Sequence, residues 1–113
     1  MPQYLVAIHR PNHFDPFTVK DEAMSRDIDV LNDEMKAAGI RKFVGGLQPR
    51  HTARSLRRQA DGQIALADGP FLTTTEYVDG FWVLEVADLD AALAWGRKAA
   101  TACRASVEVR PFH

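Results

Sequence analysis

The chain has 113 residues, 46% hydrophobic and 26% charged, which is typical of a soluble globular protein. This length fits a single domain over residues 1–113, whose thin core would gain from burial against a partner. The formal net charge of −1 argues against nucleic acid or an acidic membrane as a partner. Cys103 is the one cysteine, which excludes an intramolecular disulfide, and no apolar run suits a signal peptide or a membrane span. A cytoplasmic location is therefore expected.

Residues 3–9 are predicted to form the first strand. Apolar side chains occur on both of its alternating faces: Tyr4, Val6 and Ile8 on one, Leu5 and Ala7 on the other. A strand that is apolar on both faces is covered on both faces. This pattern indicates that something besides the chain's own helices packs on the sheet.

Two amphipathic helices are predicted. The first follows a proline-marked loop at residues 11–17 and opens at Thr18, where Thr18 and Asp21 fit a variant capping box. Its apolar stripe consists of Met24, Ile28, Leu31, Met35 and Ala38, and Gly39 is expected to cap its end. The second helix is expected to start after Asp88 as N-cap, with a buried stripe of Leu89, Ala92, Leu93, Gly96, Ala99 and Ala100.

Further strands are expected at residues 43–47, 52–59, 63–67, 81–86 and 106–110. The second and third of these form a hairpin around Asp61-Gly62, and the strand at 81–86 is central because it is nearly continuously apolar. The order of elements predicts an α+β fold: a ferredoxin-like βαββαβ sheet with both helices on one face and an extra β-hairpin. We expect a second copy to cover the other face, giving a homodimeric α/β barrel with a small-molecule crevice.

The segment Asp68-Gly69-Pro70-Phe71 is the most unusual string in the chain. Gly69-Pro70 enforces a turn, and Asp68 either stabilises that turn through backbone N–H groups or serves as a general base or ligand anchor at a crevice mouth. Phe71 is either a core or interface residue or a platform for a ligand.

Several segments together resemble the YCII-related family, in its DGPF branch. They are the segment Asp68-Gly69-Pro70-Phe71, Gly80-Phe81, and residues 45–49, 88–95 and 106–111. The resemblance implies a ferredoxin-like α/β fold, a dimer and kinship of fold with muconolactone isomerase. It also implies a family of mostly uncharacterised members, a proposed His/Asp active site, and a link of some members to alternative sigma factors.

Only part of the family pattern can be carried over. Asp68 matches the characteristic aspartate and Glu76 agrees, but Thr73 and Thr75 stand where the branch often has a glutamate and a lysine. The family histidine does not align securely, and His9 is the candidate because it lies at the end of the first strand, where an imidazole suits acid–base work. The catalytic candidates are therefore Asp68 and His9.

The remaining candidates concern ligand binding. His13, Phe71 and Glu76 are the predicted binding residues. The spacing of His9, His13 and Asp15 suggests metal ligands, but Pro11 forbids the helix that would align them and cysteine ligands are missing, so no metal and no cofactor is predicted. The basic run Arg50, Arg54, Arg57 and Arg58 falls on both faces of its strand, which favours a solvated hairpin over a phosphate site.

Three hypotheses remain open. The chain is an enzyme, or a former enzyme, that transfers a proton on a small organic molecule in a dimer crevice, as isomerases and lyases do. Alternatively it is a non-catalytic binding or regulatory module, linked to transcription through a sigma factor, or a structural dimer without a ligand. Gly45-Gly46 lacks the spacing of a nucleotide-binding loop, so nothing in the sequence identifies the ligand.

Overall fold

The structure, a computed structural model, describes residues 1–14 and 22–113. The elements in chain order are β1 Gln3–Pro11, α1 Glu22–Ala37, β2 Arg41–Gly46, the short 3₁₀ turn η1 Arg50–Thr52, β3 Arg54–Arg58, β4 Ile64–Asp68, β5 Glu76–Glu85, α2 Leu89–Cys103 and β6 Ser106–Pro111. The capping box predicted at Thr18 and the loop residues beyond Phe14 lie outside the described residues.

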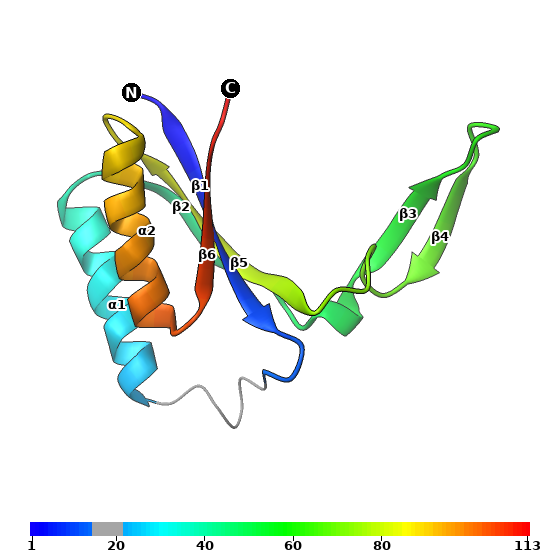
Figure 1. Ribbon diagram of the computed structural model, residues 1–113, viewed down its shortest axis with the longest axis horizontal. Helices are drawn as coiled ribbons and strands as arrows, with labels where there is room; N and C mark the ends of the chain where they lie inside the picture. Colours follow the sequence, from blue (N-terminus) through cyan, green and yellow to red (C-terminus); the bar gives the residue numbers. More distant parts are fainter. Residues whose placement is uncertain (15–21) are drawn as a thin grey trace.

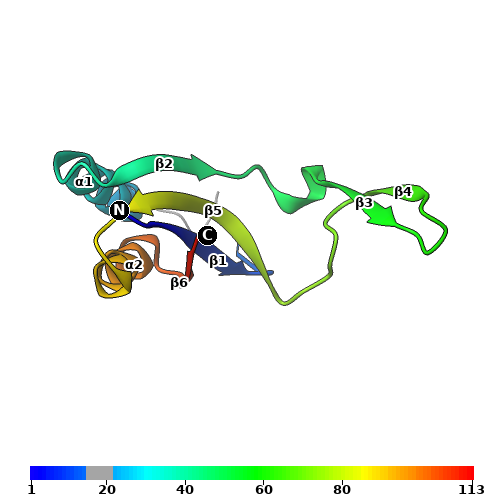
Figure 2. The ribbon, with the colours of Figure 1, turned by 90° about the horizontal axis from the view of Figure 1, so that it is seen from above.

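The main sheet has four antiparallel strands in the order β2-β5-β1-β6. Both helices lie on one face of it, and the other face carries no helix among the described residues (Figures 1 and 2). This order and the βαββαβ succession are those of a ferredoxin-like fold, so the predicted α+β class is confirmed. The predicted central position of the strand around Phe81 is confirmed as well, since β5 lies between β2 and β1.

The core lies between the sheet and the helices. β1 contributes Tyr4, Val6 and Ile8, β5 contributes Trp82 and Leu84, and the helices contribute Met24, Leu31, Met35, Ala92, Ala99, Ala102 and Cys103. Trp82 satisfies its buried indole N–H by donating to Asn32 Oδ1 at 2.9 Å. No helix in the described ranges is long and apolar enough to span a bilayer.

The helices largely follow their predicted stripes. Gly39 adopts φ 70° just beyond α1, and Asp88 caps α2 by accepting a bond from the Ala91 N–H at 2.9 Å. Two stripe residues are exceptions. Ala38 is exposed because α1 ends one residue earlier, and Leu89 is 47% exposed because a first-turn residue has core neighbours on one side only.

β5 begins five residues before the predicted strand. The sequence around Asp79-Gly80 interrupts the apolar run, and the structure has a bulge there: Ile8 pairs with Gly80 and His9 with Val78, which leaves Asp79 as the extra residue. A bulge allows strand pairing to continue beyond such an interruption, and it changes the direction of the extra residue's side chain. The strand therefore continues to Glu76, which the periodicity alone did not predict.

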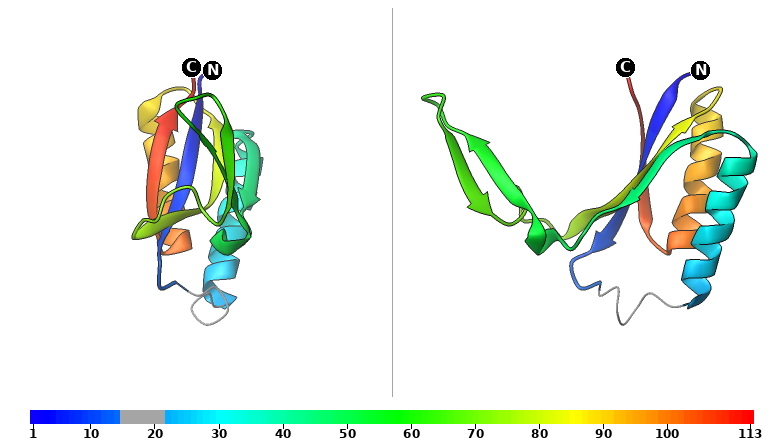
Figure 3. Two further views of the ribbon diagram at one scale, coloured as in Figure 1. Left: turned by 90° about the vertical axis from the view of Figure 1, so that its right-hand side faces the viewer. Right: turned by 180° about the vertical axis from the view of Figure 1, so that it is seen from behind.

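β3 and β4 form a separate two-stranded sheet, here called the arm (residues 54–68). Its turn is the predicted Asp61-Gly62 pair, with Gly62 at φ 87° and the Gln63 N–H donating to Asp61 Oδ1 at 3.0 Å. The first strand of the hairpin starts later than predicted because Thr52 belongs to η1. The arm stands off the body on the side of the sheet that faces away from the helices (Figures 1 and 3).

Candidate functional site

A crevice of about 630 Å³ lies where β1 ends, where β5 begins and where the chain enters and leaves the arm. Its apolar walls include Leu47, Phe71, Leu72 and Val78. Its polar groups come from His9, Gln48, Arg50, Thr52, Thr74, Glu76 and Tyr77. An apolar cleft with a few convergent polar groups is the usual form of a small-molecule site.

His9 and Glu76 lie on the same face of the β1–β5 ladder. His9 pairs with Val78 and Glu76 pairs with Pro11, so the two are diagonal neighbours, about 7–8 Å apart at Cα. His9 follows Leu5 and Ala7 on the face turned away from the helices. His9 is half-buried and Glu76 is exposed, and within the described ranges neither side chain has a polar partner. An imidazole and a carboxylate are thus available at one end of the crevice.

Arg50 supplies the positive charge of the crevice. Its guanidinium lies 5.1 Å from the centre of the Tyr77 ring and donates to Asn12 Oδ1. Asn12 in turn donates through Nδ2 to the Thr74 carbonyl, and its backbone N–H bonds to the Thr75 carbonyl at 2.9 Å. These contacts connect η1, the end of β1 and the start of β5. These contacts therefore hold the Arg50 guanidinium in place at the edge of the crevice.

Phe71 lies on the wall of the crevice and is 52% exposed. Arg57 of the arm stacks over its ring at 4.2 Å and donates from Nη2 to its carbonyl at 3.2 Å. This pair joins the root of the arm to the crevice wall. One face of the ring is covered by the guanidinium.

Asp68 and His13 lie outside the crevice. Asp68 ends β4, its side chain is 89% exposed, and its Oδ1 lies 3.1 Å from Arg54 Nε. The turn that follows is held by other groups: Gly69 has φ 93°, its N–H donates to the Ala53 carbonyl at 2.8 Å, and Ser55 Oγ donates to the Gly69 carbonyl at 2.6 Å. His13 is exposed beyond the end of β1. Of the five predicted site residues, the structure brings His9, Phe71 and Glu76 together.

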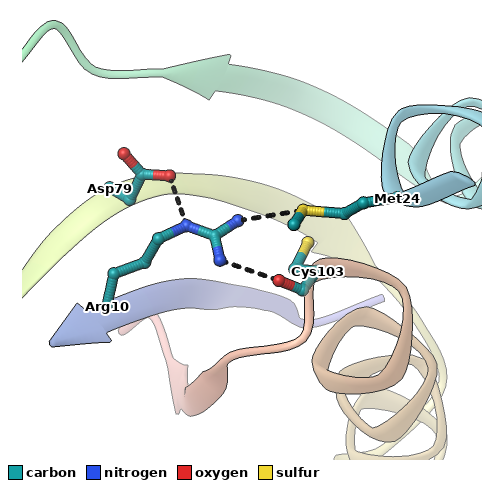
Figure 4. Close-up of polar contacts among 4 residues, drawn as sticks. All are labelled: Arg10, Met24, Asp79 and Cys103. Carbon is teal, nitrogen blue, oxygen red and sulfur yellow. Dashed lines mark hydrogen bonds and ion pairs between the residues drawn. The ribbon is translucent and has the colours of Figure 1, made fainter. Parts of the chain in front are cut away.

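Sequence reasoning missed a second polar cluster, centred on Arg10 (Figure 4). Arg10 is only 3% exposed, and its Nε lies 2.9 Å from Asp79 Oδ2. Its Nη1 donates to the Cys103 carbonyl at 2.8 Å, its Nη2 approaches Met24 Sδ at 3.8 Å, and Phe14 stacks on it at 4.2 Å. A signal was present in the sequence. Arg10 continues the alternation of Tyr4, Val6 and Ile8 and so is in phase with the buried face.

The Arg10 cluster borders a smaller cavity of about 190 Å³ between β5, β2 and the helices. Asn32 also borders it, and its side chain is already engaged by Trp82 and by Arg41 Nη1 at 3.1 Å. The polar groups here are therefore mostly bonded to one another. The larger crevice is the stronger candidate for a ligand.

Comparison with known proteins gives the family. Residues 1–113 match the YCII-related domain. The chain belongs to the YCII-related domain family. Over 95 residues it is 36% identical to an uncharacterized protein of Rhizobium meliloti (strain 1021), an alignment that covers 82% of this chain and 76% of that protein. The family resemblance predicted from the motifs is confirmed, whereas the assignment to the DGPF branch stays a prediction.

Neither comparison attaches an activity to this YCII-related domain.

Proposed function

We propose that this YCII-related domain acts as a homodimer that binds a small organic molecule in the crevice and transfers a proton on it. His9 is the acid–base group, Glu76 assists it, and Arg50 holds an anionic substituent of the ligand. The observation that carries the proposal is the placement of an imidazole and a carboxylate on one face of the ladder, beside an apolar-walled crevice and without polar partners among the described residues.

The chemistry follows from these groups. A neutral imidazole takes a proton from a substrate carbon next to a carbonyl, and the resulting imidazolium returns it to another atom of the same substrate. Such an isomerisation conserves atoms and electrons and requires no redox partner. The guanidinium of Arg50 would stabilise the charge that develops on the carbonyl oxygen.

Asp68 and His13 stay candidates in this proposal, but with a condition. In their own chain they lie away from the crevice, so a direct role requires that a partner copy or a ligand reach them.

The alternative function is a non-catalytic binding or regulatory module, which would bind a ligand in the same crevice without turnover. The two functions differ only in whether a bound ligand exchanges a proton.

The test is a thermal-shift screen of small organic acids and lactones, followed by deuterium exchange of each hit in D₂O by NMR. A ligand at about 100 times its Kd adds about 2.7 kcal/mol to the free energy of unfolding, so real hits are readily seen. We expect His9→Gln to keep binding and lose proton exchange, and Arg50→Gln to lose binding.

Asp68→Asn tests the remaining candidate carboxylate, which lies outside the crevice of its own chain. Unchanged binding and exchange would exclude a role for Asp68, whereas loss of either would mean that a partner copy or the ligand reaches it. Hits that bind the wild type without exchange would support the binding module over the enzyme. Hits that stabilise wild type, Arg50→Gln and His9→Gln equally, with equal exchange, would contradict the crevice as the site.

A further inference from the structure

The arm exposes one apolar face. Leu56 pairs with Leu66, and Arg58 pairs with Ile64, so these side chains share a face of the hairpin. Leu56, Ile64 and Leu66 are 66%, 56% and 69% exposed. Among the described residues, β3 and β4 pack on each other and neither packs extensively on a helix or strand of the body.

An unsupported arm of this kind is energetically unfavourable. A lone two-stranded hairpin is marginally stable in water, and a contiguous exposed apolar patch marks an interaction site. Asp61-Gly62 fixes the turn, but a turn alone does not bury the leucines. The arm therefore needs a surface to pack against.

The body has an uncovered apolar surface on the same side. The face of the main sheet turned away from the helices carries Leu5, Phe43, Phe81 and Val83, which are half-buried or exposed. The Phe43 and Phe81 rings lie 5.6 Å apart, and Phe43 is 52% exposed. The arm stands on this side of the sheet (Figures 1 and 3), and within the described ranges β3 and β4 make no extensive contact with its strands.

The charges of the arm and the body are complementary. The arm, residues 54–68, contains three arginines and two aspartates, a formal net charge of +1. The rest of the chain holds eleven basic and thirteen acidic residues, a net charge of −2. On the uncovered sheet face Glu108 is paired with Arg110, which leaves Glu76 at the end of that face as the carboxylate without a polar partner among the described residues. On the arm Arg54 is paired with Asp68, and Arg58 is the arginine beside the leucines that forms no such pair there. Opposite charges favour contact between the arm of one copy and the body of another.

We infer that the arm clasps a second copy of this chain, burying its Leu56, Ile64 and Leu66 face against the partner's body. By two-fold symmetry each copy gives one arm and receives one. An interface of standard size takes about 20–30 residues from each partner. The fifteen residues of the arm fall short of this, and residues of the uncovered sheet face make up the rest. The inference rests on the homodimer proposed above and assigns the arm as the element that stabilises its interface.

The test compares two adjacent positions on β4 whose side chains point to opposite faces of the arm. Leu66→Glu places a carboxylate on the apolar face, and Ala65→Glu places the same group on the other face. Burial of one leucine corresponds to about 10- to 100-fold in a dissociation constant. We therefore expect Leu66→Glu to weaken the dimer at least about tenfold by analytical ultracentrifugation, and Ala65→Glu to change it less than about threefold.

Hydrogen exchange provides the second measurement, and circular dichroism checks that each variant is folded. In the wild type, the cross-strand amides of residues 54–68 should be protected in the dimer and lose protection on dilution to monomer. A dimer equally stable in both glutamate variants, with the arm amides unprotected, would overturn the role of the arm while leaving the homodimer intact. A wild-type chain that stays monomeric would overturn both.

Discussion

Arg10 carries a buried charge that the fold must compensate. Its guanidinium contacts Asp79, the Cys103 carbonyl and Met24, and the ion pair to Asp79 is short at 2.9 Å. Asp79 is 34% exposed on its side chain, so water screens part of this pair. Removing one partner of such a pair costs more than the pair itself contributes, because the other charge stays buried.

Asp79→Asn should therefore destabilise the fold, by about 1.5–3 kcal/mol, the range for a hydrogen bond to a charged group. Asp68→Asn serves as the control: its carboxylate is 89% exposed and pairs with an exposed arginine, so we expect a change within about 0.5 kcal/mol. Urea unfolding of both variants measures the difference. Equal stability of the two would show that the buried arginine does not depend on Asp79.

At the scale of the strand, β2 and β5 approach each other closely at a glycine. A Cβ added to Gly80 would lie 2.7 Å from the Gly45 carbonyl oxygen and 3.1 Å from Gly46 Cα. Backbone atoms cannot move aside as a side chain can. Gly80→Ala should cost about 1–3 kcal/mol through displacement of the strand.

Gly46→Ala is the matched control on the paired strand. Nothing lies within 4 Å of its Cβ, so the variant should keep the wild-type stability or gain up to about 1 kcal/mol from reduced freedom of the unfolded chain. Thermal or denaturant unfolding measures the difference in stability between the Gly80→Ala and Gly46→Ala variants. A destabilisation of Gly46→Ala as large as that of Gly80→Ala would contradict the close approach.

Periodicity and caps predicted most elements, because these signals are local. The stripe from Met24 to Met35, the cap at Asp88 and the Asp61-Gly62 turn all appear as expected. The start of β5 was not predicted, because the bulge at Asp79 depends on pairing with β1 and produces no regular pattern in the sequence. The hairpin was predicted as an addition to the ferredoxin-like sheet, and the structure has it as a separate two-stranded sheet.

The candidate site was predictable only in part. His9 was predicted because it ends an apolar strand, Phe71 because it lies in the unusual segment 68–71, and Glu76 because it agrees with the family pattern. That Glu76 would lie diagonally to His9 depends on strand register, which a single sequence does not fix once a bulge intervenes. Arg50 was assigned to a solvated hairpin, whereas the structure has it on the crevice rim because η1 precedes the arm.

At the scale of the whole molecule, two apolar surfaces remain uncovered in one chain. They are the sheet face around Phe43 and Phe81, and the arm face around Leu56 and Leu66. Burying either against a second copy removes apolar area from water at about 25 cal/mol per Å². The homodimer proposed above would cover both surfaces at once. The crevice, at the root of the arm, would then lie beside the interface.

The molar mass in solution tests this account most directly. One chain has a mass of 12.6 kDa, so a dimer has twice that, about 25 kDa. Light scattering coupled to size-exclusion chromatography at micromolar concentration should give the dimer mass across the whole peak. A uniform peak at the mass of one chain would contradict the account, because both apolar surfaces would then be stable in contact with water.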